Sequence, residues 1–519
     1  RSVTMTRRLF LFALALAVAF TMIPGFAIAE SEPAAADLEP VTLDWYFGQT
    51  EMPDCSLVNE AVNEYLQEKL NTTVNLHYWG LAEDWEKMVT MISSGQDVGI
   101  IGFGSQTKLD YVVQSQRGAY YPIEDLLDTH APETKALFSD EIWECMTIND
   151  HIYGIPSLKD NGYYISLVYN DTLAQELGIN MDEVEYRNWR DLEELGLEVK
   201  EKRDAAHPEW ADYPVFWTNN LVYPYNFAFE TFLNDSYLAV CDIDEFDQIA
   251  GVDSSQVVNF YATDEFREYC IQRQRMVDEG LYAYDYTDRT DWQYTGAIFG
   301  WVGWGYTYME EHMYGENFVT KMKMSENLWT ETNNYFSAGT AISANCANPE
   351  RAMMVLNLIN TDPDFATMMR FGIEGTHYVV DEEGNMSFEG TRNEDPTNRS
   401  YYYWYMAPIG NLLITRAPEQ LVGPDSIMLT NMQKYNEEAV LPAHFGFVFD
   451  TAPVINEIAA CTNVIAEYQT DLANGQLNSA DEVNQAVDEF VEKLNANGAE
   501  KIVAEVQSQI DAWQAAKAA

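Results

Sequence analysis

Three short apolar segments near the start of the chain decide its fold: LDWYF at 43–47, TVNLHYW at 73–79 and VGIIGF at 98–103. Each has the length and the apolar pattern that is typical of a buried β-strand. Between them lie two stretches with apolar residues at helical spacing, 56–70 and 83–93. The order strand, helix, strand, helix, strand predicts a parallel, doubly wound α/β unit.

Sheets of this kind bind ligands outside the carboxyl ends of their strands. Glycines follow those ends here and allow close approach to the backbone, while aromatic rings and amides stand beside them. The residues at these ends are therefore candidate ligand contacts: Phe47, Gln49, Trp79, Phe103, Ser105 and Gln106. The alternative is that the aromatic ones complete a core.

The charge of the chain excludes several kinds of partner. Among 519 residues, 83 are acidic and 29 basic, which gives a net charge of −54. Nucleic acids and anionic membranes are recognised through basic surfaces, so neither is expected as a partner. With 47% hydrophobic residues the chain can bury a large core, and its length predicts two to four domains or lobes.

The first 29 residues have the features of a secretory signal peptide. Arg7 and Arg8 precede an apolar run from 9 to 23, and Ala27-Ile28-Ala29 gives the small-x-small pattern of a cleavage site. We expect cleavage near Ala29, a polar linker over 30–40, and export to the periplasm, the cell surface or the medium. An uncleaved anchor is the alternative, although its apolar core is short for a bilayer.

No motif for catalysis, nucleotide binding or metal binding is present. None of the six cysteines forms a C-x-x-C pair, so we expect isolated buried thiols. Acidic clusters at 242–247 and at Asp285, Asp288 and Asp291 are expected by chance in a chain this acidic, and we predict no metal and no cofactor.

Two runs combine aromatic residues with amides or glycines: WTNNLVYPYNF at 217–227 and FGWVGWGY at 299–306. Sugar rings stack on exposed aromatic faces, and neighbouring polar groups bind their hydroxyls. Tyr223, Tyr225, Trp301 and Trp304 are therefore further candidate ligand contacts. Core packing is the alternative role for all four.

Several blocks in order along the chain resemble those of one family. They include HIYGIP at 151–156, YYISLVYN at 163–170, FGIEGTHY at 371–378 and FGFVFD at 445–450. From Val41 onward the chain resembles extracellular solute-binding proteins of ABC transporters, in the sugar-binding group. The resemblance is strongest to LplA-type lipoproteins with a characteristic C-terminal region. It implies an α/β, type II-like periplasmic-binding-protein fold of two lobes, each with a mixed or parallel sheet flanked by helices, and a ligand cleft between them.

The resemblance also implies lobe boundaries and residue roles. Lobe one would comprise 41–160 and 336–410, and lobe two 161–335 and 411–519. Asn161 would lie at a crossover where a polar residue can touch the ligand, whereas Glu374 and His377 are expected to be structural. The usual Gram-positive members of that family carry a lipobox cysteine directly after the signal peptide, but the first cysteine here is Cys55, so a lipid anchor is not expected.

The expected function is the capture of a small organic solute, above all an oligosaccharide, and its delivery to an ABC permease. The protein would act as a monomer and would not be an enzyme. A peptide-binding protein and a secreted glycan-acting enzyme remain alternatives; the enzyme would need two carboxylates facing each other across the cleft. An adhesin is disfavoured because the sequence contains no repeats.

Overall fold

The computed structural model describes residues 35, 38–80, 85–104, 107, 109–216, 227–233, 236–244, 246, 248–282, 295–304, 319–382, 386–395, 397–403, 410–416 and 428–518. The predicted signal peptide lies outside these ranges. Within them, no helix combines the length and the apolar character needed to cross a membrane.

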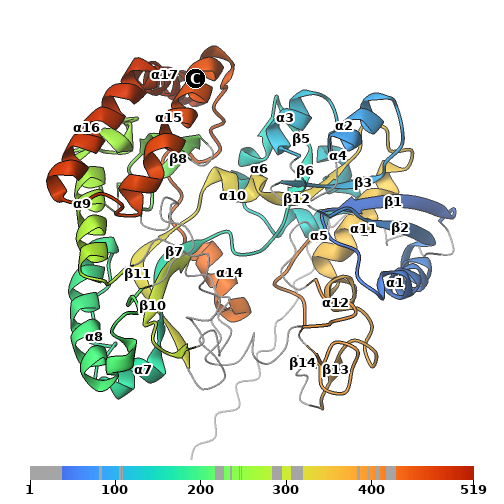
Figure 1. Cartoon of the computed structure of the whole chain (residues 1–519). Helices are drawn as coiled ribbons and strands as arrows, with labels where there is room; N and C mark the ends of the chain where they lie inside the picture. The colour runs from blue at the N-terminus through green and yellow to red at the C-terminus, as the bar shows by residue number, and fades with distance from the viewer. Residues whose placement is uncertain are drawn as a thin grey trace, which may run out of the picture.

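Two lobes lie side by side (Figure 1). The first is built on a five-stranded sheet in the order β2-β1-β3-β12-β6. Strands β1, β2 and β3 are parallel, and β12 runs antiparallel to both β3 and β6. The strands are β1 (Val41–Phe47), β2 (Thr72–Tyr78), β3 (Ile100–Gly104), β6 (Gly154–Pro156) and β12 (Ala338–Ile342).

Helices flank this sheet: α1 (Cys55–Leu70), α2 (Glu86–Ser93), α3 (Tyr111–Gln116), α4 (Glu124–His130), α5 (Pro132–Lys135), α6 (Asp140–Cys145), α11 (Pro349–Thr361) and α12 (Pro363–Phe371). Helix α1 buries Val58, Val62 and Leu66, at the spacing that places one stripe against the sheet. The predicted alternation of strands and helices over 43–103 is thus confirmed. Two hairpin-like pairs complete the lobe, β4 (Thr147–Ile148) with β5 (His151–Ile152) and β13 (Val379–Val380) with β14 (Met386–Ser387).

The second lobe contains a sheet in the order β10-β7-β11. Its strands are β7 (Tyr163–Asn170), β10 (Gly300–Trp304) and β11 (Thr320–Trp329). Ile165, Leu167 and Tyr169 alternate along β7 toward a core that includes residues of α7 (Asp171–Glu176) and α8 (Leu192–Ala206). The three strands pair antiparallel, because β7 enters the lobe and β11 leaves it, side by side. Isolated parallel bridges join Gly300 of β10 to Phe216 and Trp329 of β11 to Val440, so the pairing in this lobe is mixed.

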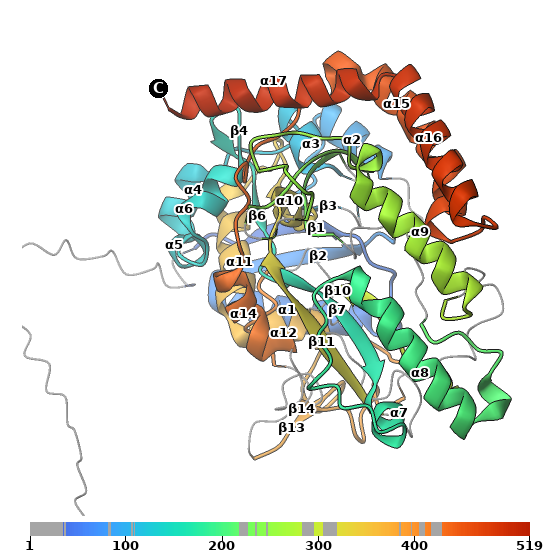
Figure 2. The ribbon, with the colours of Figure 1, turned by 90° about the vertical axis from the view of Figure 1, so that its left-hand side faces the viewer.

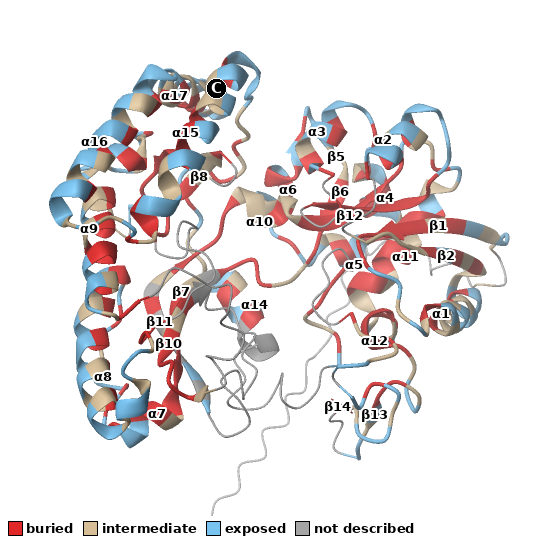
Figure 3. Ribbon diagram, viewed as in Figure 1, coloured by how far each residue is buried: buried red, intermediate tan, exposed pale blue. Residues whose placement is uncertain are grey.

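A second core in this lobe is mainly helical. It includes the strand pair β8 (Glu230–Leu233) and β9 (Ser236–Cys241) and the helices α9 (Asp264–Asp278), α15 (Ile455–Ala473), α16 (Ala480–Ala496) and α17 (Ala499–Lys517). Ser479 caps α16 by accepting the amide hydrogen of Glu482. Helix α17 runs across the top of the molecule (Figure 2). Apolar sides of the helices are buried and their outer sides exposed (Figure 3).

Hydrogen bonds join the segments that cross between the lobes. The carbonyl oxygen of Asn161 accepts bonds from Thr330 Oγ1 at 2.6 Å and Asn334 Nδ2 at 2.9 Å. These residues precede or lie in α10 (Thr332–Phe336), which leads back to β12. Asn436 of α14 (Met428–Glu438) binds both the Lys159 carbonyl and the Gly162 amide. Three stretches far apart in sequence are thus bound together at the junction.

The six cysteines are all buried and unpaired, as the sequence predicts. Burial raises the pKa of the Cys145 and Cys270 thiols far above its ordinary value. Such thiols are unreactive, because the thiolate is the nucleophilic form.

Candidate functional site

The carboxyl ends of β1 and β2 lie next to each other and form one edge of the first lobe. The carbonyl oxygen of Phe47 accepts hydrogen bonds from the amides of Gln49 at 2.9 Å and Trp79 at 3.1 Å. A Cβ atom at Gly80 would lie 3.2 Å from Thr50 Oγ1. Three of the strand-end residues predicted from the sequence, Phe47, Gln49 and Trp79, are therefore brought together at this edge.

Trp79 is partly exposed at this edge, as is its neighbour Tyr78. Its ring contacts Tyr46 and Trp85 edge to face, with centroids 5.5 Å and 5.3 Å apart. Trp85 is fixed in turn by a hydrogen bond from Nε1 to the Gly80 carbonyl. Tyr46 stacks on His77 at 4.1 Å, and His77 Nε2 lies 2.7 Å from Asp44 Oδ1. The Trp79 ring is thus held in place by rings on two sides.

Phe47 and Phe103, the other predicted rings of this edge, are buried in the core at 0% and 1% exposure. Phe103 packs on Tyr111 at 4.8 Å. A Cβ atom at Gly154 or Gly339 would lie 2.6 Å or 2.2 Å from the Phe103 ring. The two glycines therefore make room for this ring inside the lobe, which favours the packing role over ligand contact.

Of the remaining candidates in the first lobe and in the run at 217–227, one is buried and the others lie outside the described residues. Gln49 is buried, with 6% of its surface exposed. Ser105, Gln106, Tyr223 and Tyr225 lie outside the described residues. Their contact with a ligand stays a prediction.

Trp301 and Trp304 both lie in strand β10, opposite Val168 and Ile165 of β7. Since successive side chains of a strand point to opposite faces, Trp301 lies on the face opposite its neighbour Val302. Val302 is buried in the core of this lobe, whereas Trp301 is half-buried. The Trp304 backbone lies at the end of β10 nearer the crossovers, and its side chain is outside the described part.

Asn161 lies in the crossover before β7, as predicted, but its side chain is 1% exposed. Its Nδ2 donates to the Ser157 carbonyl at 3.2 Å. Its carbonyl oxygen also accepts the bonds from Thr330 and Asn334. In this conformation Asn161 therefore joins the crossover segments to each other.

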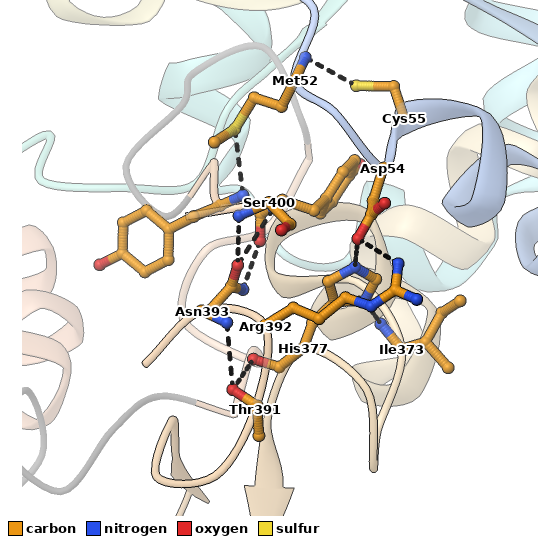
Figure 4. Close-up of polar contacts among 11 residues, drawn as sticks. Met52, Asp54, Cys55, Ile373, His377, Thr391, Arg392, Asn393 and Ser400 are labelled. Carbon is orange, nitrogen blue, oxygen red and sulfur yellow. Dashed lines mark hydrogen bonds and ion pairs between the residues drawn. The ribbon is translucent and has the colours of Figure 1, made fainter. Parts of the chain in front are cut away.

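His377 and its partners connect the FGIEGTHY block to the start of α1 (Figure 4). The amide of Ile373 donates to His377 Nδ1 at 3.0 Å, so Nδ1 is unprotonated and Nε2 carries the hydrogen that points to Asp54 Oδ2 at 3.1 Å. Burial lowers the pKa of His377 despite the carboxylate beside it. Arg392 also binds Asp54, at 2.8 Å. Although burial opposes it, the bonds from Arg392 and His377 lower the pKa of Asp54. His377 is structural, as its sequence context suggested.

Acidic residues in the described part of the chain hold loops together. Asp242 accepts the amide hydrogens of Gln248 and Ile249, each at 2.7 Å. Asp244 accepts two hydrogen bonds from Ser254. Within the described ranges, no three His, Cys, Asp or Glu residues are arranged to hold a metal ion. The cluster at 285–291 lies outside those ranges.

A cavity of about 440 Å³ lies away from the strand ends, between α6 and α17. Its lining combines Glu141 and Glu144 with Leu441, Phe445 and Trp513. None of the ligand contacts predicted from the sequence lines it.

Sequence reasoning missed the residues that position Trp79. Trp85 lies in the stretch 83–93, for which the sequence predicts a helix, and it is 3% exposed, but helical spacing does not reveal its contact with Trp79. Tyr46 and His77 were not singled out. The signal that could have found them is the parallel pairing of β1 with β2, which places Tyr46 opposite His77.

Comparison with known proteins supports this architecture. Residues 443–515 match the model of a domain of unknown function, DUF3502. The chain is 24% identical, over 86% of its length and 86% of the relative's, to a carbohydrate ABC transporter substrate-binding protein of Streptococcus pneumoniae serotype 4.

The crystal structure of the N-glycan transport solute binding protein NgtS from Streptococcus pneumoniae superposes with a TM-score of 0.72 and 23% identity, covering 91% of this chain and 98% of that one. The chain has the fold of a solute-binding protein. The same relative in complex with Man5GlcNAc gives a TM-score of 0.62 at 23% identity, covering 92% and 98% of the two chains. The two-lobe α/β fold and the family resemblance inferred from the sequence are thereby confirmed.

Proposed function

We propose that this protein is an extracytoplasmic solute-binding protein that captures an oligosaccharide between its lobes and delivers it to an ABC permease. The observation that carries the proposal is the half-buried Trp79 ring, held by Tyr46 and Trp85 at the carboxyl ends of the parallel strands β1 and β2. The relatives support it, since one is named a carbohydrate substrate-binding protein and another was crystallised with Man5GlcNAc.

The physical argument concerns how a sugar ring is held. Its C–H face is apolar and stacks on an indole, while its hydroxyls need polar partners near that ring. A ring fixed in advance loses little freedom on binding, which favours affinity. The glycine-containing turns beside Trp79 leave backbone amides and carbonyls near such a ligand. Closure of the second lobe, with Trp301 or Trp304, would supply the opposite side of the site.

The finer features of the function belong to the same proposal. We expect the lobe boundaries at 160/161, 335/336 and 410/411, cleavage of the signal peptide near Ala29, and a monomer that binds its ligand without changing it. One core cluster holds buried residues from 43 to 155 and from 341 to 403, which supports that division, and it also includes Tyr335 and Phe445 from the ranges given to lobe two.

The test is a thermal-shift screen of the mature protein with Man1GlcNAc, Man5GlcNAc, kestose and a set of short peptides. A ligand at 100 times its Kd stabilises the folded state by about 2.7 kcal/mol. We expect at least one saccharide to raise Tm and to be recovered unchanged. A shift with peptides alone would overturn the sugar assignment, and conversion of the saccharide into products would favour the glycan-acting enzyme.

A further inference from the structure

The segment from His444 to Phe447 contacts both lobes. Phe445 is buried in the core of the first lobe, where its ring meets Tyr335 edge to face at 5.6 Å. Phe447, two residues later, is buried in the helical core of the second lobe. Gly446 lies between them with φ +88°, a conformation that favours glycine. One residue therefore separates the two cores at this place.

A buried pair ties the start of this segment to the second lobe. His444 Nδ1 lies 2.8 Å from Glu230 Oε2 of β8, and the His444 amide donates to the same oxygen at 3.2 Å. The two side chains are 1% and 6% exposed. Burial raises the pKa of Glu230, against the effect of the neighbouring imidazole. Neither group would be stable at this depth without the other.

Contacts to the first lobe and to the crossover hold the next residues. The Gly446 amide donates to Thr332 Oγ1 of α10 at 2.9 Å. A Cβ atom on Gly446 would lie 3.3 Å from the Cα atom of Cys145 in α6. The chain is thus bound to lobe two at 444, to lobe one at 445 and 446, and to lobe two again at 447.

The segment opens the region that matches the domain of unknown function, 443–515. At the far end of that region the chain returns to lobe one. Lys517 Nζ lies 4.0 Å from the centroid of the Trp513 ring and 2.9 Å from Glu144 Oε1 of α6. The C-terminal region is therefore packed on lobe two and touches lobe one at both of its ends.

We propose that Glu230, His444 and Gly446 are positioning residues for ligand capture, because they limit the range of angles between the lobes from which closure on the ligand begins. The inference rests on the proposed function, in which the two lobes close on a solute. If the range of angles is unrestricted, a smaller fraction of the molecules is poised to close on the ligand, and the apparent affinity falls by that fraction.

The first test compares two carboxylate–histidine pairs, the buried Glu230–His444 pair and the Asp54–His377 pair, whose carboxylate is 16% exposed. Glu230→Ala removes the pair between β8 and the crossover, while Asp54→Ala removes the His377 pair inside lobe one and is the matched control. Spin labels are attached at Glu68→Cys on α1 and Glu492→Cys on α16, both exposed. The native thiols are buried and do not compete for the label. Pulsed EPR then gives the distribution of distances between the lobes.

We expect Glu230→Ala to broaden this distribution and to weaken binding of Man5GlcNAc about threefold to tenfold. Glu230→Gln, which keeps an acceptor for the His444 amide, should restore the narrow distribution. Asp54→Ala should lower Tm but leave the distribution unchanged. The same distribution in Glu230→Ala as in the parent would overturn the proposal.

Two glycines provide a second test that does not depend on the buried pair. Gly446→Ala places a side chain at φ +88°, and Gly280→Ala does so at φ +68° within lobe two, where the nearest atom is the flexible end of Lys200 at 3.7 Å. Both should lower Tm, and the first alone should shift the distance distribution. If neither glycine variant changes the distance distribution, the proposal is wrong, even if Glu230→Ala does not fold. The distances need no ligand, so failure of every saccharide to bind would refute the proposed function and leave this test intact.

Discussion

The two lobes place their aromatic residues differently with respect to their sheets. In lobe one, Phe47 and Phe103 stand at strand ends but are buried, and Trp79 keeps an exposed part. In lobe two, Trp301 lies within a strand, on the face opposite the buried Val302. An aromatic residue at a strand end is therefore not by itself a ligand contact. The role of such a ring depends on whether the side toward which it points is filled by the core or open to solvent.

Glycine provides that space in the core of lobe one. Gly154 and Gly339 lie on the two strands beside the Phe103 ring, and a methyl group on either would collide with it. The sequence shows these glycines but not that they face Phe103, because β6 and β12 are far from β3 in the chain. The burial of Phe103 depends on this pairing.

The largest expected effect tests the buried ring. Phe103→Ala should lower the free energy of unfolding by about 3–5 kcal/mol, because it leaves a cavity over two glycines. Urea unfolding followed by circular dichroism measures this loss. If the variant is as stable as the parent but binds saccharide poorly, Phe103 contacts the ligand and the distinction between buried and exposed rings fails.

The second prediction concerns the tryptophans of β10. Replacing the one that stacks on the ligand with alanine should weaken saccharide binding by about 2–4 kcal/mol, a typical loss for a central contact. The fold should persist, because a ring that faces the ligand adds little to the core. Trp301→Ala and Trp304→Ala are made separately, and affinity is measured by calorimetry. If both variants bind saccharide like the parent, the tryptophans of β10 do not contact the ligand.

Trp79→Ala tests the corresponding ring of lobe one. It should weaken binding by about 1–3 kcal/mol, since the ring is half-buried and shares its surface with Tyr46 and Trp85. Trp85→Ala is the control, because Trp85 is 3% exposed and should lower Tm more than affinity. A larger loss of Tm than of affinity in Trp79→Ala would show that this ring serves packing.

The sequence predicts lobe one better than lobe two for a physical reason. The units at 41–47, 55–70, 72–78, 86–93 and 100–104 are adjacent in sequence and in space, so their periodicity reveals their pairing. The sheet of lobe two joins 163–170 to 300–304 and 320–329, and no local pattern fixes such pairing or its antiparallel direction. The site follows the same rule. Trp79 could be proposed because it stands at a strand end. Its contacts with Tyr46 and Trp85 depend on tertiary structure, and so does the Glu230–His444 pair.

A smaller effect, of pH, tests the buried histidine of lobe one. The pKa of His377 is lowered by burial, so the unfolded chain binds a proton at a pH where the folded protein does not. Stability should therefore be complete above the ordinary histidine pKa of about 6.5 and should fall as the pH drops below it. His377→Asn, which keeps an acceptor for the Ile373 amide, should lose less stability between pH 7 and pH 5. Parallel curves for the two proteins would show that other groups cause the loss.

The smallest expected effect is that of salt, which acts on both lobes. Exposed acidic residues lie on lobe-one helices, such as Asp125 and Asp128 of α4, and on lobe-two helices, such as Glu194 and Glu198 of α8. Salt screens the repulsion among them, and it also weakens surface pairs such as Lys493–Glu467 at 2.7 Å. Exposed pairs contribute little each, and 83 acidic residues face only 29 basic ones, so relief of repulsion should dominate. We expect Tm to rise by about 1–2 °C between roughly 0.02 and 0.5 M sodium chloride, since 1 kcal/mol corresponds to about 2–4 °C in large domains. A steady fall in Tm would mean that attractive pairs outweigh the excess of negative charge in both lobes.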